Sequence, residues 1–180
     1  MAIVRSVSWP PGSRWLRLAD PSWDDPLDAT FAARFGGRWT PVGGEPTLYL
    51  CADAPTAWRI VTARLASSPV NVEDVRDEAG PDLVDVELAP PVTAIDAASN
   101  EGLVAAGLPT SYPLDGVDGD VVGHTDCRPV GAAAAADEFD GVYARSAATR
   151  DGRGRELAWF PKRRAARLRA RSPFTVWSRQ

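Results

Sequence analysis

The segment Arg34-Phe35-Gly36-Gly37-Arg38-Trp39-Thr40-Pro41 places two adjacent glycines in front of an arginine and a tryptophan. Glycine adopts backbone conformations that are closed to other residues, so the pair predicts a tight turn that presents Arg38. A predicted strand, Leu48-Tyr49-Leu50, brings a tyrosine eleven residues after Arg38, and a helix is predicted to begin near Pro55. An arginine turn, a strand tyrosine and a helix start in this order predict a polar pocket.

Taken alone, this glycine pair is also typical of an ordinary turn, with Arg38 as a solvated cation and Trp39 and Tyr49 as core aromatics. The longer pattern is more informative. Residues 34–41, followed by a Gly-rich connection, Leu48-Tyr49-Leu50 and Pro55-Thr56-Ala57, resemble the signature of the RES-domain family. Members of that family are the toxins of RES–Xre toxin–antitoxin pairs. The resemblance spans roughly residues 15–160, and its specific part is the block 34–57.

The resemblance implies an ADP-ribosyltransferase-like fold and NAD as the substrate. The implied reaction is cleavage of the nicotinamide–ribose bond, with transfer of ADP-ribose to a protein acceptor or splitting of NAD by water or phosphate. Arginine suits the pyrophosphate of NAD because its planar fork pairs bidentately with phosphate oxygens. The candidates for binding the nucleotide are Arg17, Arg38, Tyr49, Thr125 and Ser146.

These candidates have different expected roles. Arg17 matches an arginine in the first strand of the family, and Arg38 is expected to bind phosphate. Tyr49 is expected to hold the nicotinamide, and Ser146 or Thr125 to position the ribose or the amide. Two alternative interpretations stay open: Arg17 as a solvated strand residue, and Ser146 as a turn residue that caps local backbone.

One position departs from the family pattern. The family carries a glutamate eleven residues after the tyrosine, and the corresponding residue here is Ile60. An isoleucine neither accepts a hydrogen bond nor offsets developing positive charge. Either a carboxylate arrives from elsewhere, with Glu156 as a candidate and Asp53 and Glu45 nearby in sequence, or the chain is a pseudoenzyme that binds NAD or a related nucleotide without turning it over. The expected catalytic set is therefore Arg38, Tyr49, Ser146 and Glu156.

The resemblance also implies a protein partner. Family members are held inactive by an antitoxin with a helix-turn-helix domain, whose terminal segment can cover the NAD pocket. If this chain has such a partner, an exposed patch is expected around the mouth of the pocket.

The predicted architecture is α+β, with a mixed or antiparallel sheet of short strands and helices packed around it. Strands are predicted at 13–18, 47–51, 83–88, 94–96, 142–144 and 155–161, and helices at 29–34, 55–66, 100–106 and 130–138. The helices do not alternate with strands regularly enough for a doubly wound parallel sheet, and no Rossmann glycine fingerprint occurs. Asp53 is the expected N-cap of the second helix.

Length and composition favour one soluble domain over residues 1–180. Hydrophobic residues make up 44% of the chain and charged residues 24%, which is typical of a globular protein. Neither a signal peptide nor a membrane-spanning run is predicted, so a cytoplasmic location is expected and a membrane partner is not.

Charge is unevenly distributed. The last twenty residues, 161–180, carry seven cations and no acids, so a net charge of −11 falls on residues 1–160. Two interpretations stay open. The basic end faces phosphates, nucleic acid or an acidic partner, or it packs against the chain's own acidic stretch 73–87. Direct nucleic-acid binding is the weakest of the functional hypotheses.

Metal binding is not expected. His124, Asp126 and Cys127 lie close together in sequence, but a structural zinc site needs four ligands and no second cluster exists. Cys51 and Cys127 are expected to be free thiols.

Overall fold

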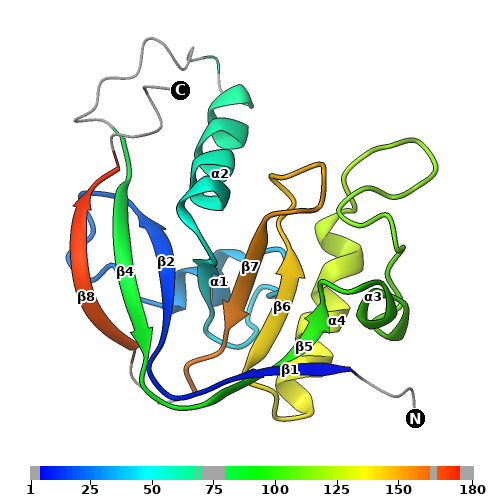
Figure 1. Cartoon of the computed structure of the whole chain (residues 1–180), viewed down its shortest axis with the longest axis horizontal. Coiled ribbons are helices and arrows are strands. Elements are labelled where there is room, and N and C mark those ends of the chain that lie inside the picture. The colour runs from blue at the N-terminus through cyan, green and yellow to red at the C-terminus, as the bar shows by residue number, and fades with distance from the viewer. Residues whose placement is uncertain (1–4, 68, 70–79, 163–165, 175–180) are drawn as a thin grey trace.

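The computed structural model describes residues 5–67, 69, 80–162 and 166–174. Its strands form one eight-stranded sheet in the order β1-β5-β6-β7-β3-β2-β4-β8 (Figure 1). The strands are β1 (Ser6–Trp9), β2 (Ser13–Ala19), β3 (Leu48–Cys51), β4 (Asp82–Leu88), β5 (Val92–Ala97), β6 (Gly141–Arg145), β7 (Arg155–Trp159) and β8 (Ala166–Pro173). The helices are α1 (Thr30–Phe35), α2 (Ala54–Ala66), α3 (Asn100–Ala105) and α4 (His124–Ala136).

The predicted fold class is confirmed. Neighbouring strands pair antiparallel except β5 and β6, which are parallel, so the sheet is mixed and the fold is α+β. All six predicted strands occur, as β2 to β7. The two strands that the sequence did not predict, β1 and β8, form the edges of the sheet. Edge strands need only one paired side, and β8 carries the charged side chains that often protect such edges.

The start of α4 corrects the prediction. The helix was expected to begin after Pro129, but it begins at His124 and ends at Ala136, with Pro129 inside its second turn. Proline has no N–H, so at this position the helix loses only the hydrogen bond to the carbonyl of Thr125. The N-cap of α2 is as predicted, because Asp53 Oδ1 accepts a hydrogen bond of 2.7 Å from the Thr56 N–H.

The sheet opens between the neighbouring strands β2 and β3. In β2 and β3, only Leu16 and Cys51 are paired; continuing that register would place Leu18 opposite Tyr49, but no pairing forms there. Figure 1 shows β2, β4 and β8 as one group and β7, β6 and β5 as another, with α2 above the gap. The divergence creates a fork whose sides are formed by β2 and β3.

The register shows which side chains share a face of the sheet. Tyr49 lies opposite Ala158, and Ala158 opposite Val142, so these three project to the same side. Ala158 and Val142 pack with Val130 and Ala134 of α4, so α4 covers this face. The opposite face has its own apolar cluster of buried side chains, among them Trp15, Leu48, Leu50, Val84, Val86, Leu157 and Trp159.

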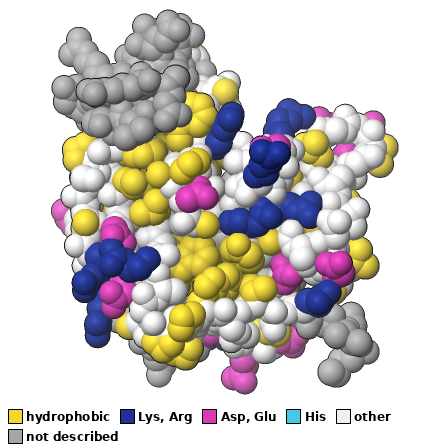
Figure 2. Space-filling model, viewed as in Figure 1, with side chains coloured by type: hydrophobic (Ala, Val, Ile, Leu, Met, Phe, Trp, Pro, Cys, Tyr) yellow, Lys and Arg dark blue, Asp and Glu magenta, His cyan; other side chains and the backbone are white. Residues whose placement is uncertain are grey.

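The described part of the basic end is used within the chain. Arg167 and Arg169 lie 3.5 Å from the carboxylate of Glu87, and Arg171 lies 2.6 Å from Asp82. Figure 2 shows dark blue and magenta side chains interleaved along the edge formed by β4 and β8. The intramolecular interpretation is therefore confirmed for these three arginines. Residues 73–79 of the acidic stretch, and 163–165 and 175–180 of the basic end, lie outside the described residues.

In the described part of the chain, the helices are too short or too polar to cross a membrane.

Replacing Gly131 with alanine is expected to destabilise the fold. Gly131 lets α4 contact the main chain of the arginine turn, because a Cβ atom there would lie 1.6 Å from the carbonyl oxygen of Trp39. Neither backbone can move away cheaply, so Gly131→Ala should lower the free energy of unfolding by about 3 kcal/mol or more, measured by urea denaturation. The matched variant Ala132→Ser, exposed on the same helix, should change it by less than about 0.5 kcal/mol. Equal stability of the two variants would contradict this packing.

Candidate functional site

A cavity of about 430 Å³ lies in the fork between β2 and β3. Four of the predicted site residues line it: Arg17, Arg38, Tyr49 and Glu156. They come from four different places, namely β2, the turn after α1, β3 and β7. Ile60 and Arg64 of α2 complete the lining on the helix side. The fold thus brings together residues that are up to 139 positions apart in sequence.

Arg38 is held by the loop before α4. Gly36 has a φ of +80°, a conformation that favours glycine, and it leads the chain from α1 into the turn. The Nη1 of Arg38 donates a hydrogen bond of 2.6 Å to the carbonyl of Val122. A second donor stabilises the turn, because Arg128 Nε donates to the carbonyl of Gly37 at 3.1 Å. Val122 belongs to the long loop 109–123, so this loop orients Arg38, the residue that is predicted to bind phosphate.

Tyr49 locks the turn onto β3. Its hydroxyl oxygen accepts a hydrogen bond of 2.9 Å from the Trp39 N–H and lies 3.2 Å from Thr40 Oγ1. A Cβ atom at Gly37 would lie 2.2 Å from the same hydroxyl oxygen. The second glycine is therefore required by the tyrosine ring and not by the shape of the turn. Burial raises the pKa of Tyr49, which keeps the phenol protonated at neutral pH.

Arg17 is a buried cation that forms no salt bridge with an acid in the described part of the chain. Only 6% of the residue is exposed, and its Nε has no hydrogen-bond partner among the described residues. Its Nη2 donates to the carbonyl of Asp28 at 3.2 Å, and its guanidinium lies 5.7 Å from the centre of the Trp23 ring. Burial lowers the pKa of Arg17 to about 10. A desolvated guanidinium with an unused donor beside an open cavity calls for an anionic ligand.

Glu156 brings the carboxylate of the site from β7. It is half-buried, and its neighbour across the sheet is Cys51. Burial raises the pKa of the Glu156 carboxyl, while a hydrogen bond from Ser146 and the positive charge of Arg38 act in the opposite direction. Ile60 lines the same cavity. Among the described residues that line the cavity there is one carboxylate, and it comes from β7 and not from α2.

The remaining predicted residues lie elsewhere. Ser146 is fully buried and is not among the lining residues, although its hydrogen bond with Glu156 lowers the pKa of that carboxyl. Its Oγ also accepts a hydrogen bond of 3.2 Å from the Ala148 N–H, as in the alternative interpretation of a residue that caps local backbone. Thr125 is exposed in the first turn of α4 and is not part of the lining. Of the other acids near the turn in sequence, Glu45 does not line this cavity, and Asp53 caps α2 and lines a different one.

The lining residues that sequence reasoning missed include Trp23, Phe31 and Arg64. Trp23 and Phe31 belong to a loop and a short helix, and no local pattern aims them at the fork. For Arg64 a signal was available. It follows Ile60 by four positions on a predicted helix, so both side chains lie on the same face.

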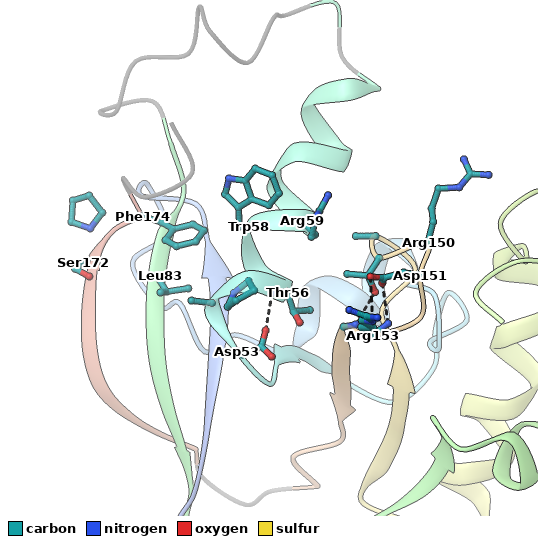
Figure 3. A pocket seen from close by; sticks show the side chains of 16 residues that line it. Asp53, Thr56, Trp58, Arg59, Leu83, Arg150, Asp151, Arg153, Ser172 and Phe174 are labelled. Carbon is teal, nitrogen blue, oxygen red and sulfur yellow. Dashed lines mark hydrogen bonds and ion pairs between the residues drawn. The ribbon is translucent and has the colours of Figure 1, made fainter. Parts of the chain in front are cut away.

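A second, larger cavity of about 840 Å³ lies on the other side of α2. Figure 3 shows it between Trp58 and Arg59 of α2, the arginines of the β6–β7 loop, and Leu83 and Phe174. Its three arginines, Arg59, Arg150 and Arg153, are exposed to solvent. None of the predicted site residues lines it. The larger volume of the second cavity therefore does not make it the candidate site. The smaller cavity is favoured because it is lined by Arg17, which is buried and has an unsatisfied Nε.

The cysteines and the single histidine do not form a metal centre in the described part of the chain. No group of three His, Cys, Asp or Glu side chains there is placed to hold an ion. Cys51 and Cys127 are free and buried. The Sγ of Cys127 lies 3.8 Å from Arg38 Nη1, which makes it part of the packing around that arginine.

Comparison with known proteins supports the assignment of the fold. The structure resembles a chain in the crystal structure of the M. tuberculosis MbcT–MbcA toxin–antitoxin complex, with a TM-score of 0.73 and 23% sequence identity. The match covers 96% of this chain and 89% of the other. A search of curated proteins finds no match.

A comparison of the sequence with models of protein families identifies the family. The model of the RES domain matches residues 12–178, so the chain belongs to the RES domain family. The matched range extends beyond the resemblance seen in the sequence, which ended near residue 160. It includes β8, which the structure places in the same sheet.

Replacing Arg17 should stabilise the free protein. Burial lowers the pKa of Arg17 in the folded protein to about 10. At neutral pH, which is below this value, the arginine is charged in the folded and in the unfolded protein, so the full cost of burying the charge lowers the free energy of unfolding. Arg17→Met should therefore raise the free energy of unfolding, by at most about 3 kcal/mol at 1.36 kcal/mol per pKa unit. Arg14→Met on the same strand should have little effect, since Arg14 forms an exposed ion pair with Asp85. Chemical denaturation measures both, and a large loss of stability in Arg17→Met would contradict the assignment.

Proposed function

We propose that this chain is a RES-type toxin that binds NAD in the cavity between β2 and β3 and cleaves its nicotinamide–ribose bond. The observation that carries the proposal is the buried Arg17, whose Nε is unsatisfied, in one cavity with Arg38, Tyr49 and Glu156. A cavity of this size and lining fits a nucleotide ligand. Membership of the RES domain family supports the same substrate.

The arginines suit the pyrophosphate of NAD. Arg17 reaches the cavity from β2 and Arg38 from the turn, so they approach the ligand from two directions. Each offers a planar set of donors that matches phosphate oxygens. Phosphate binding would also offset the desolvation of Arg17, since an opposite charge favours the charged form of a buried group.

Glu156 is the group that we assign to the chemistry. When the nicotinamide–ribose bond breaks, its electron pair leaves with nicotinamide, and positive charge develops at C1′ and the ring oxygen of the ribose. A carboxylate beside that ring stabilises the charge, and an oxygen of water, phosphate or a protein acceptor then bonds to C1′ and loses its proton. A fixed charge of this kind supplies on the order of 3 kcal/mol. The hydrogen bond with Ser146 lowers the pKa of Glu156 and so favours the ionised carboxylate.

A pseudoenzyme is the alternative, and Ile60 is the observation that favours it. The α2 position that carries a carboxylate in the family pattern is apolar here, and Ile60 also packs partly into the apolar cluster beneath α2. In this case NAD or a related nucleotide would bind without turnover. Release of nicotinamide by the purified chain separates the two functions.

We also propose an antitoxin partner with a helix-turn-helix domain. The similar crystal structure is of a toxin–antitoxin complex. Three apolar side chains on or beside the lining are exposed: Phe31, its neighbour Phe35, and Val42, which lies next to the lining residue Gly36. Phe31 lines the cavity and its ring lies 4.7 Å from that of Phe35. An apolar cluster beside a binding site is typical of an interaction surface.

Moving the carboxylate back to α2 tests the assignment of Glu156. Glu156→Gln should lower the rate of nicotinamide release from NAD by roughly 100-fold or more, because a neutral amide cannot offset the developing charge. Adding Ile60→Glu to that variant should recover part of the rate, since residues 60 and 156 line the same cavity. The control is Glu45→Gln, which should leave the rate unchanged. Full activity in Glu156→Gln would contradict the role of this carboxylate, and no release by the unmodified chain would favour the pseudoenzyme.

The reaction should fail at acid pH. Only the ionised form of Glu156 stabilises positive charge, and burial raises its pKa above the ordinary value of 4.5. Activity should therefore be present above this raised pKa and be lost as the pH falls through it. A profile of kcat/KM against pH reports the value for the free enzyme. In Glu156→Gln with Ile60→Glu the acid limb should move, whereas an unmoved limb would assign it to another group.

A further inference from the structure

Helix α2 brings a third arginine to the cavity. Arg64 follows Ile60 by one helical turn, and both line the fork between β2 and β3. The charge of Arg64 acts on groups inside the cavity. It lowers the pKa of Arg17, and it opposes the rise in the pKa of Cys51 and of Glu156. Arg64 is exposed, whereas Arg17 is buried, so the two mark the rim and the interior of one site.

The cavity consequently has an excess of positive charge. Among the described lining residues, Arg17, Arg38 and Arg64 share the cavity with one carboxylate, Glu156. Among the described residues, none of the three arginines forms a salt bridge with an acid. Like charges that share a site without counterions repel one another, and the repulsion is strongest where solvent is excluded. A ligand with more than one negative charge relieves this repulsion, and a neutral ligand does not.

We propose that Arg64 is a pyrophosphate-binding residue and that α2 contacts the ligand through phosphate. The inference rests on the proposed function, because it concerns the same cavity, but it names the chemical class that the cavity selects. That class is nucleotides with a diphosphate bridge. Three guanidinium groups reach the cavity from β2, from the turn after α1 and from α2, so they can surround two linked phosphates. The face of α2 that holds an acid in the family pattern therefore presents Ile60 and Arg64 instead.

Binding of ADP-ribose tests this assignment without requiring turnover. ADP-ribose contains the diphosphate but has no nicotinamide bond to cleave. Isothermal titration calorimetry of the full chain with Arg64→Gln should show binding weakened by about tenfold or more, as expected for the loss of a charge-assisted hydrogen bond. Arg64→Lys should bind between the unmodified chain and Arg64→Gln, because it keeps the charge but loses the planar fork.

Arg59→Gln is the matched control. Arg59 lies on the same helix, but its side chain lines the other cavity (Figure 3). It should bind ADP-ribose within about twofold of the unmodified chain, as expected if only arginines in the fork contact the ligand. Thermal unfolding of both variants checks that the fold is intact.

Binding of ADP-ribose tests the role of Arg64, and release of nicotinamide tests the proposed function, so the two can fail independently. If Arg64→Gln binds ADP-ribose as Arg59→Gln does, or if the unmodified chain does not bind ADP-ribose, the role of Arg64 is wrong. The proposed function would still stand in either case if the chain released nicotinamide from NAD in a reaction dependent on Glu156. If ADP-ribose binds through Arg64 and no nicotinamide is released, the inference holds and the catalytic part of the proposed function fails.

Discussion

The turn that carries Arg38 is fixed by two close contacts, and the rest of the site depends on them. On one side the hydroxyl of Tyr49 occupies the space that a side chain at position 37 would fill. On the other, Gly131 lets α4 approach the carbonyl of Trp39. Both contacts require glycine, since van der Waals repulsion rises steeply at such distances. Together they connect β3, the turn and α4 into one rigid wall beside the fork.

The opposite side of the fork contains a buried charge, Arg17, whose desolvation is unfavourable. Arg17 is buried in β2 with an unsatisfied Nε, which a fold selected for stability alone would not keep. The loop that packs beside it is held from outside, because Arg171 of β8 donates to the carbonyls of Trp23, Asp20 and Pro21. The edge strand thus supports the side of the cavity that holds Trp23. A charged group held in an unfavourable setting by its surroundings is typical of a functional site.

The position of the acid distinguishes this chain from the pattern that its sequence resembles. Ile60 removes the carboxylate from α2, and Glu156 supplies one from β7 into the same cavity. The two positions come from different elements, so a carboxylate at either one enters the cavity from a different direction. The arginine at position 64 changes the α2 face further, from acidic to basic. In this cavity, α2 therefore contributes a positive charge and β7 the negative one.

The sequence by itself determined the local structure around the site. The turn at Gly36, the strand of Tyr49 and the N-cap Asp53 each carry a local sequence pattern, so the sequence was sufficient to predict them. The need for glycine at position 37 has another origin, because it comes from the contact with the Tyr49 hydroxyl. It also predicted Arg17, Arg38, Tyr49 and Glu156 as candidates, partly through a family resemblance. Only the tertiary structure showed that these four share one cavity, and that Ser146 and Thr125 do not line it. The divergence of β2 from β3 decides this arrangement, and it arises from packing between distant segments, which no local pattern records.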